Sequence, residues 1–247
     1  MQTYQAPENA LANKTILITG AGDGIGRVAA LTYAKYGATV ILLGKTTSKL
    51  EAVYDEIVAA GYPQPAIVPM DLRGATKQHY RDLAATVEQQ FGKLDGLLNN
   101  ASILGSLGPL EHFCSSTFEN IMKVNVTAQA MITKALFPVM RKAPHASIIF
   151  TSSGVGRKGR EFWGAYAISK FATEGMMQTW AEEVGKTNIR INCINPGATR
   201  TSMRASAFPG EDKEKLKTPE QLMPTYLYLM SDDSIAVNGE SLDAQTY

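Results

Sequence analysis

The sequence predicts an α/β protein: a single doubly wound domain whose parallel sheet of about seven strands carries helices on both faces. Three observations lead to this prediction. Short apolar runs, rich in β-branched residues, alternate along the chain with longer segments of helical pattern. These runs are continuously apolar, as strands covered on both faces are. The 247 residues contain no linker, repeat or low-complexity tract, which favours one domain over residues 14–247 after a surface arm over residues 1–13.

The strands are predicted at the apolar runs. They lie at residues 14–19, 38–43, 66–70, 94–100, 146–152, 189–194 and 240–244. The helices are predicted between them, at residues 27–37, 48–60, 76–91, 116–137, 163–186 and 219–230. Strands that alternate with helices in this way form βαβ units, so their carboxyl ends meet at one edge of the sheet.

Local signals predict several helix ends. Serine–glutamate capping boxes predict two starts, at Ser48 with Glu51 and at Ser116 with Glu119. An N-cap followed by proline and a capping glutamine predicts another, at Thr218, Pro219 and Gln221. Gly37 is expected to end the first helix, and Pro138 to lie in the last turns of the helix that reaches about Phe137.

Composition excludes several classes of function. The formal net charge is +1 with Lys and Arg dispersed, so neither nucleic acid nor an anionic membrane is indicated as a partner. No apolar run approaches the ~18 residues of a spanning helix, and the N-terminus lacks the basic start and apolar core of a secretory signal. We therefore expect a cytoplasmic protein, with Cys114 and Cys193 as small buried thiols. The three histidines lack metal-ligand spacing, so no metal site is predicted.

A glycine-rich turn follows the first predicted strand and opens a helix. Without side chains, Gly20 and Gly24 can turn sharply and admit a phosphate close to the backbone, and the helix N-terminus offers free N–H groups to it. Gly26 would allow the helix to pack closely on the strand. The spacing differs from G-x-G-x-x-G, and glycines at such a place are often only turn residues. Their position directly after the strand favours a nucleotide-phosphate site.

Residues 151–170 hold the pattern from which we infer chemistry. Ser153 lies thirteen positions before Tyr166, and Lys170 lies four positions after that tyrosine. On a helix, Tyr166 and Lys170 share one face. An ammonium nearby favours the phenolate and is expected to bring the phenol pKa, ordinarily about 10, toward the working range. The three groups suit proton transfer coupled to reduction or oxidation, although a Tyr–Lys pair alone is more often packing with a solvated charge.

Polar or glycine residues follow six of the predicted strands. These are Gly20, Lys45, Asp71, Asn99, Ser153 and Pro196. Because ligands of such sheets bind beyond the carboxyl ends of the strands, where the strand order reverses, we expect these residues to lie around one site.

With these residues assembled, the chain resembles the short-chain dehydrogenase/reductase family from about Lys14 to Ala244. The resemblance rests on the cofactor loop at residues 19–26, the Asn-Asn-Ala motif at residues 99–101, Asn125, the Ser and Tyr-x-x-x-Lys pattern, and the Pro-Gly segment at residues 196–197 with Thr201 beyond it. It implies a Rossmann fold and an NAD(P)-dependent oxidoreductase that acts on a carbonyl or secondary alcohol.

The resemblance also implies residue roles. Tyr166 is the acid/base, Lys170 lowers its pKa and holds the nicotinamide ribose, Ser153 orients the substrate oxygen, and Asn125 keeps a water in the proton relay. Alternatively, the Asn125 amide satisfies the backbone of a kinked helix. The implied cofactor-binding residues are Gly20, Asp23, Gly24, Ile25, Gly26, Lys45, Asp71, Leu72, Asn99, Ala101, Tyr166, Lys170, Pro196, Gly197, Thr199 and Thr201.

The residues after the second strand favour NADP(H) over NAD(H). An NAD enzyme usually places a carboxylate there for the ribose 2′-OH, whereas this chain has Lys45 and no acid. The Lys45 ammonium would bind an anionic 2′-phosphate. Alternatively, Lys45 is a solvated charge at a helix start. Asp23 stands where NADP-preferring relatives often carry a basic residue, so NAD(H) is the alternative.

The chain departs from the family pattern in several places. Ser102 stands where the family usually has glycine, which would alter the floor of the nicotinamide pocket, and no Gly-Gly follows the last predicted strand. Residues 201–217 lie where relatives have a substrate lid. Arg157, Lys158 and Arg160 would bind an acidic substrate, or they are simply solvated charges. A homodimer or homotetramer is expected. A catalytically silent NADP(H)-binding or sensing protein, and a lyase or epimerase, are the alternative functions.

Overall fold

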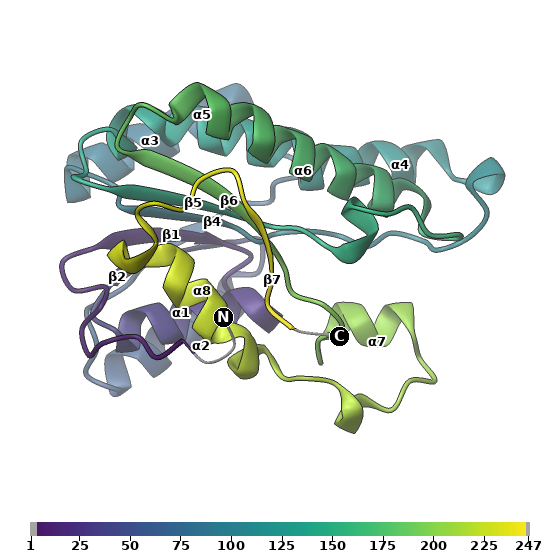
Figure 1. Ribbon diagram of the computed structural model, residues 1–247, viewed down its shortest axis with the longest axis horizontal. Coiled ribbons are helices and arrows are strands. Elements are labelled where there is room, and N and C mark those ends of the chain that lie inside the picture. Colours follow the sequence, from purple (N-terminus) through teal and green to yellow (C-terminus); the bar gives the residue numbers. More distant parts are fainter. Residues whose placement is uncertain (1–3, 246–247) are drawn as a thin grey trace.

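The computed structural model describes residues 4–245, which form a parallel sheet between two layers of helices (Figure 1). The sheet order is β3-β2-β1-β4-β5-β6-β7, and neighbouring strands are parallel throughout the described residues. The strands are β1 Thr15–Thr19, β2 Thr39–Gly44, β3 Ala66–Pro69, β4 Gly96–Asn99, β5 Ala146–Thr151, β6 Ile189–Asn195 and β7 Ser241–Asp243. The predicted doubly wound sheet is confirmed, and its order reverses between β1 and β4, where a ligand crevice is expected.

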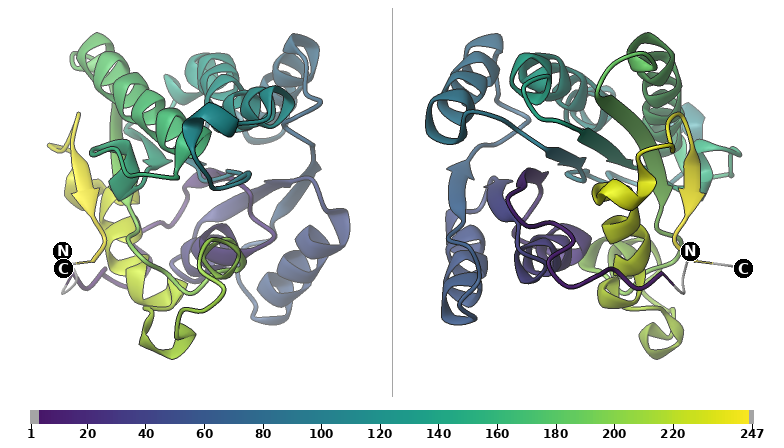
Figure 2. Two further views of the ribbon diagram at one scale, coloured as in Figure 1. Left: turned by 90° about the vertical axis from the view of Figure 1, so that its right-hand side faces the viewer. Right: turned by 60° about the vertical axis from the view of Figure 1, so that its left-hand side comes forward.

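The helices cover both faces of the sheet (Figures 1 and 2). One layer holds α1 Gly24–Lys35, α2 Thr47–Ala59 and α8 Met223–Met230. The other holds α3 Lys77–Phe91, α4 Ser115–Met122, α5 Ala128–Met140 and α6 Gly164–Val184. The short helix α7, Ser202–Ala207, lies beyond the carboxyl ends of the strands, at the front of the left view in Figure 2.

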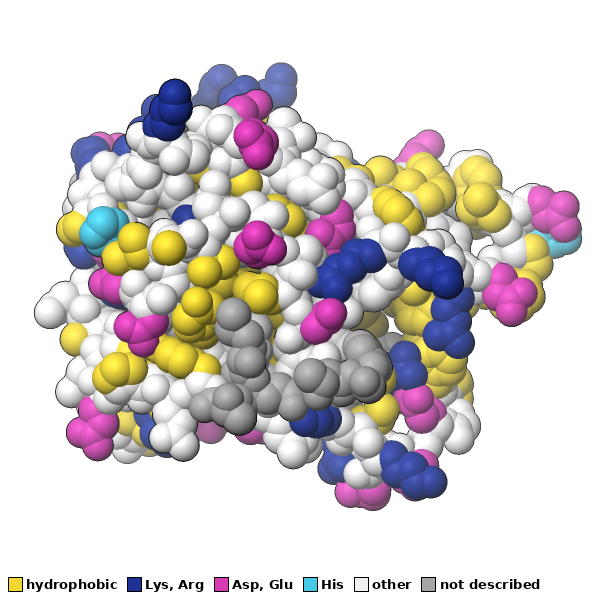
Figure 3. Space-filling model, in the orientation of Figure 1, with side chains coloured by type: hydrophobic (Ala, Val, Ile, Leu, Met, Phe, Trp, Pro, Cys, Tyr) yellow, Lys and Arg dark blue, Asp and Glu magenta, His cyan; other side chains and the backbone are white. Residues whose placement is uncertain are grey.

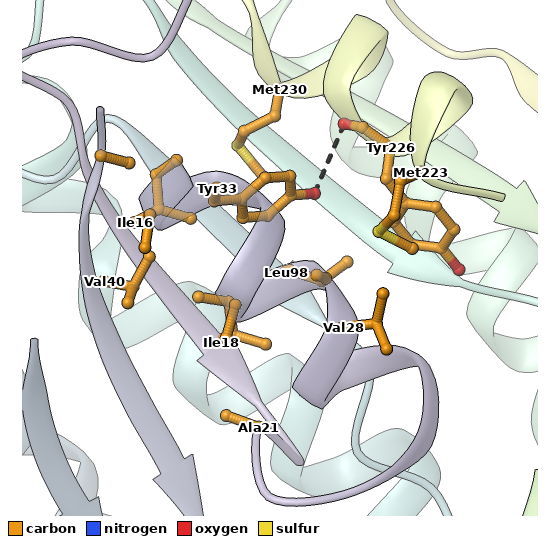
Figure 4. Close-up of a cluster of buried hydrophobic side chains, with 14 of the residues drawn as sticks. Ile16, Ile18, Ala21, Val28, Tyr33, Val40, Leu98, Met223, Tyr226 and Met230 are labelled. Atoms are coloured by element: carbon orange, nitrogen blue, oxygen red, sulfur yellow. Dashed lines mark hydrogen bonds between the residues drawn. The ribbon is translucent and has the colours of Figure 1, made fainter. Parts of the chain in front are cut away.

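Apolar side chains fill the space on both sides of the strands. On the α1 side, Ile16 and Ile18 of β1 pack with Val28 of α1 and Met223 of α8 (Figure 4). The phenol of Tyr33 donates a long hydrogen bond of 3.4 Å to a backbone oxygen of α8. Doubly covered strands explain why the sequence shows continuous apolar runs rather than alternation.

The N-terminal arm is more than a surface cover. Leu11 is fully buried in the core beneath α1, and the ring of Tyr4 packs edge-on against Tyr228 with the ring centroids 5.2 Å apart. The predicted arm at residues 1–13 therefore adds an apolar anchor to the domain over the part that the structure describes.

Two predicted helix starts are wrong by one residue. The helix α2 follows Thr46 and α4 follows Cys114, and neither N-cap residue makes a side-chain capping bond. The predicted boxes at Ser48 and Ser116 therefore do not form. In contrast, the box of Thr218 with Gln221 is present, although its first turn, Pro219–Leu222, is a 3₁₀ helix before α8. Other 3₁₀ turns are Leu110–His112, Gly154–Gly156, Lys213–Lys215 and Asp232–Ser234.

The helix predicted at residues 116–137 is divided. A π-helical turn, Lys123–Thr127, separates α4 from α5, and α5 continues through Pro138 to Met140. Proline removes the bond to the carbonyl four residues earlier, that of Lys134. Because Lys134 is exposed, water can serve this carbonyl, and the helix runs past the proline.

The remaining expectations concern cysteines, metals and membranes. Cys193 is buried as expected, whereas Cys114 is exposed, so its prediction as a buried thiol is wrong. Within residues 4–245 there is no group of His, Cys, Asp and Glu suited to a metal ion. Nor does any helix in the described range have the length and apolar character to cross a membrane.

Candidate active site

A cavity of about 570 Å³ opens at the carboxyl edge of the sheet. Residues that follow six strands line it, as expected for a doubly wound sheet. Fifteen of the predicted site residues lie on its wall: Gly20, Asp23, Gly24, Ile25, Lys45, Asp71, Leu72, Ala101, Ser153, Tyr166, Lys170, Pro196, Gly197, Thr199 and Thr201. The volume is that of an ordinary ligand site.

The glycine turn leaves room for a phosphate. Gly20 and Gly24 have φ values of +69° and +51°, which disfavour any other residue. A Cβ on Gly26 would lie 2.3 Å from the Gly20 oxygen, so only glycine lets α1 approach the turn this closely. Asp23 caps α1 by accepting a hydrogen bond of 2.7 Å from the Gly24 N–H. The wall here consists of backbone beside a helix N-terminus, a setting that attracts anions.

Basic side chains gather at the far end of the same cavity. Lys45, Lys49 and Arg73 line it after β2 and β3. Lys49 Nζ lies 2.5 Å from an Asp23 oxygen, and this hydrogen bond is the main reason why the pKa of Asp23 is lowered. Asp23, which seemed to disfavour a phosphorylated ribose, thus has its charge compensated. Arg73 is likewise paired with Asp71, at 3.6 Å. Lys45 has no acidic partner among residues 4–245, so it is the cation that this end of the cavity offers to an anionic group.

Strand β5 and helix α6 bring the predicted catalytic side chains together. Ser153 follows β5, while Tyr166 and Lys170 lie one turn apart near the start of α6. The turn at Gly156 packs directly on α6, because a Cβ there would meet the Lys170 backbone oxygen at 2.8 Å. The Lys170 ammonium donates a hydrogen bond of 2.7 Å to the Thr151 carbonyl and lies 5.5 Å from the centre of the Tyr166 ring.

Burial dominates the electrostatics of this group. It raises the pKa of Tyr166 to about 12, against smaller lowering effects from the hydroxyls of Ser153 and Ser102. It also lowers the pKa of Lys170 to about 8. The Tyr166 pKa therefore lies above its ordinary value rather than nearer to the working range, so the expectation of a lowered pKa is wrong for this geometry, because burial outweighs the effects that lower the pKa. The phenol is thus held in its protonated form at neutral pH.

A buried carboxylate behind Lys170 ties α6 to the last strand. Glu174 accepts hydrogen bonds from the hydroxyls of Ser152 and Ser241 and forms an ion pair with Arg157 at 3.6 Å. Arg157 also binds Asp243 at 2.8 Å. The charge of Arg157 is therefore compensated by Glu174 and Asp243 of the same domain.

The other loop cations also lie off the cavity wall. Lys158 and Arg160 are exposed, and neither they nor Arg157 line the cavity. The geometry therefore does not support the prediction that these three side chains bind an acidic substrate.

Three predicted site residues lie behind the cavity wall: Gly26, Asn99 and Asn125. Asn125 lies in the π-helical turn, fully buried, and its amide binds both the N–H and the carbonyl of Ile103 at 2.9 Å. Its nitrogen also donates to Ser169. The Asn125 amide thus satisfies the backbone of the loop after β4 and not, as the alternative expected, that of its own kinked helix, so the side chain positions this loop. The role of Asn125 in holding a water stays a prediction.

The other end of the cavity is apolar. Leu104, Trp163 and Met203 pack around Tyr166, and the Trp163 ring lies 5.7 Å from that of Tyr166. Arg204 also lines the cavity, but its guanidinium binds Glu211 at 2.5 Å, which neutralises its charge. In Figure 3, Lys and Arg side chains gather at the end of the molecule where α7 lies, with hydrophobic side chains between them.

Sequence reasoning missed several residues of the wall. Lys49, Arg73, Trp163 and Met203 line the cavity but were not predicted as site residues. Lys49 lies four positions after Lys45 in the sequence, but Lys45 precedes α2, so no helical spacing joins the two lysines. Met203 had no signal beyond its place in the expected lid.

Residues 14–212 match the family model described as short chain dehydrogenase. The chain belongs to the short chain dehydrogenase family. The uncharacterised oxidoreductase YciK of Escherichia coli strain K12 is 50% identical to this short chain dehydrogenase over 242 residues, which are 98% of this chain and 96% of YciK.

Solved structures agree with this assignment. A short chain dehydrogenase of Shigella flexneri 2a strain 301, complexed with NADP, is 50% identical, covers 97% of this chain and 100% of its own, and has a TM-score of 0.95. One of Escherichia coli CFT073, complexed with NADPH, is 51% identical with the same coverage and a TM-score of 0.94. This short chain dehydrogenase is accordingly an oxidoreductase with a Rossmann-like fold.

Proposed function

We propose that this protein is an NADP(H)-dependent reductase of carbonyl compounds, with Tyr166 as the acid that protonates the substrate oxygen. One observation carries the proposal: the Ser153, Tyr166 and Lys170 side chains lie in the same cavity as the glycine turn. The hydroxyl groups can bind an oxygen, and the glycine turn can bind a phosphate of the molecule that reacts with it.

NADP(H) is the cofactor that the residues favour. The glycine turn fits a pyrophosphate, and Lys45 fits a ribose 2′-phosphate, with Lys49 and Arg73 beside it in ion pairs with Asp23 and Asp71. The relatives from Shigella flexneri and Escherichia coli that were solved with NADP and NADPH support the same choice. When bound, this cofactor supplies the hydride for reduction. NAD(H) is the alternative that a titration separates.

The chain's own residues manage the proton. With a pKa of about 12, the Tyr166 phenol keeps its proton at neutral pH and can donate it as the substrate oxygen becomes an alkoxide, a stronger base than a phenolate. Ser153 holds that oxygen. The nearby Lys170 ammonium stabilises the phenolate that remains after proton transfer.

The apolar end of the cavity indicates the kind of substrate. Trp163, Met203 and Leu104 surround the position beside the Tyr166 phenol, and Arg204 is paired with Glu211. An unpaired carboxylate or phosphate would lose its hydration there without gaining a free cation. The proposed substrate is an uncharged carbonyl compound with an apolar group beside the carbonyl.

The test is a titration followed by a substrate panel. Binding of NADPH and NADH is measured by nicotinamide fluorescence, and tighter binding of NADPH is expected. Oxidation of NADPH is then followed with apolar ketones, aldehydes and quinones, and with acidic carbonyl compounds as controls. Turnover of the apolar compounds supports the proposal. Tight NADPH binding without any turnover indicates the silent or sensing protein, and product formation without net oxidation indicates a lyase or epimerase. The homo-oligomer and the cytoplasmic location stay predictions.

A further inference from the structure

Helix α6 carries a buried carboxylate that the proposed reaction does not use. Glu174 is 5% exposed and lies one helical turn after Lys170, which is 1% exposed. Moving a carboxylate or an ammonium out of water costs free energy, so buried charges are usually found with partners. Two opposite charges, one turn apart and beside a cavity, therefore indicate a role in the site as well as in packing.

The two side chains hold the end of β5 at successive residues. The Lys170 ammonium donates a hydrogen bond of 2.7 Å to the Thr151 carbonyl. The Glu174 carboxylate accepts a hydrogen bond from the hydroxyl of Ser152, which is 1% exposed. The next residue in the chain is Ser153, which lines the cavity. The charged pair of α6 thus fixes the strand end from which Ser153 extends.

The carboxylate is also held by β7 and by the loop after β5. The Ser241 hydroxyl donates to Glu174 at 2.8 Å, and the Arg157 guanidinium lies 3.6 Å from the carboxylate. Arg157 donates in turn to the Ser241 hydroxyl at 2.8 Å and to Asp243 at 2.8 Å. The position of Glu174 is therefore fixed, and its negative charge acts on two cations, Arg157 and Lys170.

The groups around Lys170 and Glu174 decide which charge favours the ammonium. These groups are Tyr166 of α6, Arg157 of the loop after β5, Cys193 of β6 and Asp243 of β7. Burial lowers the pKa of Lys170 to about 8, against raising effects from Cys193 and Glu174. Because burial raises the pKa of Cys193 well above its ordinary value, that thiol carries no charge near neutral pH. Arg157 and Asp243 compensate each other. Glu174 is then the anion that favours the Lys170 ammonium.

We propose that Glu174 is a positioning residue, whose carboxylate holds the Lys170 ammonium in its charged form and fixes the strand end that carries Ser153. The inference rests on the proposed function, in which that ammonium stabilises the phenolate left when Tyr166 gives up its proton. Glu174 lies behind the cavity wall, so it acts through Lys170 and not on the substrate. Its loss should therefore matter most at the pH where Lys170 begins to lose its proton.

The matched experiment compares Glu174→Gln with the wild type and with Glu183→Gln, at an exposed glutamate of the same helix. Glutamine keeps the size and an acceptor for the serine hydroxyls but removes the charge. The alkaline limb in the pH profile of kcat, near the Lys170 pKa of about 8, should fall by about 1 pH unit. The kcat should be about tenfold below the wild type at about pH 8.5 and within about twofold of it at about pH 6.5. Glu183→Gln should keep the wild-type profile.

The pH dependence separates this role from a purely structural one. A side chain that only packs the fold would, on substitution, lower kcat by the same factor at both pH values, and that outcome overturns the proposal. Glu174→Asp keeps the charge and should leave the limb at its wild-type position. If Glu174→Gln does not fold because Arg157 loses a partner, Glu174→Gln/Arg157→Gln is compared with Arg157→Gln alone. The same fall of the limb is expected there.

A measurement without substrate keeps the inference apart from the proposed function. The nuclear magnetic resonance signals of isotope-labelled lysine Cε atoms titrate with the ammonium, and the signal missing from Lys170→Met is that of Lys170. The pKa of Lys170 should be about 1 pH unit lower in Glu174→Gln than in the wild type. This result supports the inference even where no ketone of the panel is turned over. Equal pKa values in both proteins overturn it without touching the proposed reaction.

Discussion

Lys170 allows a quantitative test of how burial affects a charged group, because its ammonium is removed from water. Its side chain is 1% exposed, and burial lowers its pKa from 10.5 to about 8. In the unfolded chain, water restores the ordinary value. Between these two pKa values the unfolded chain binds more protons than the folded one, so this group makes stability rise with pH. Lys170→Met removes the titration and nearly keeps the volume.

The expected size follows from the two pKa values. Integrated from about pH 7 to about pH 9.5, the contribution of Lys170 to the free energy of unfolding grows by about 2 kcal/mol. Tyr33, whose pKa burial raises, acts in the opposite direction at high pH. It acts in both proteins, so its effect cancels when wild type and variant are compared. Cys193 interacts with Lys170, so the comparison is made below the pH at which its raised pKa would matter. The lost bond to the Thr151 carbonyl does not depend on pH.

The assay is urea unfolding of wild type and Lys170→Met at both pH values. The stability difference, wild type minus variant, should become more favourable to the wild type by about 2 kcal/mol at the higher pH, equivalent to about 4–8 °C in Tm. Lys186→Met, at an exposed lysine, controls for the loss of a charge. A difference that stays constant within about 0.5 kcal/mol would refute the reasoning, because burial would then not disfavour the ammonium.

Three further predictions follow from the site. Tyr166→Phe should lower kcat by about 10²–10⁴-fold with NADPH binding intact, whereas Tyr33→Phe, a buried tyrosine outside the cavity, should keep its activity in the same steady-state assay. Lys49→Ala should weaken the binding of NADPH about two- to fivefold in a fluorescence titration and leave the binding of NADH unchanged. The substitution removes a cation and leaves the Asp23 carboxylate without its partner. Equal effects on the binding of both cofactors would contradict this. Gly26→Ala should cost about 1–3 kcal/mol in urea unfolding, because its Cβ would overlap the backbone of the glycine turn; wild-type stability would contradict the close approach.

Much of the fold could be predicted because its signals are local. Continuous apolar runs located all seven strands to within a few residues, and the glycine turn and the Tyr–Lys spacing depend only on neighbours in the chain. The Asn-Asn-Ala motif and Ser153 could be placed at one edge because parallel strands bring their carboxyl ends together. The capping boxes failed at Ser48 and Ser116 because serine and glutamate on helices are also frequent without this role.

What sequence reasoning missed depends on contacts between distant segments. The π-helical turn at Lys123–Thr127 places Asn125 against the Ile103 backbone, 22 residues away, and nothing local reveals this pairing. The pKa of Tyr166 was misjudged because the spacing to Lys170 was visible whereas the depth of burial was not. The compensation of Asp23 by Lys49 likewise joins the turn after β1 to helix α2.

The side chain of Gln245, the last described residue, binds the loop that follows β6. The Gln245 amide donates to the carbonyls of Pro196 and Ala198, at 2.7 and 2.9 Å. These contacts join Gln245 to Pro196, which lies 49 residues earlier in the chain and lines the cavity. Loss of the Gln245 side chain would remove these two bonds from the loop that lines the cavity. A ligand that needs this loop ordered would then bind more weakly, although every catalytic side chain would still be present.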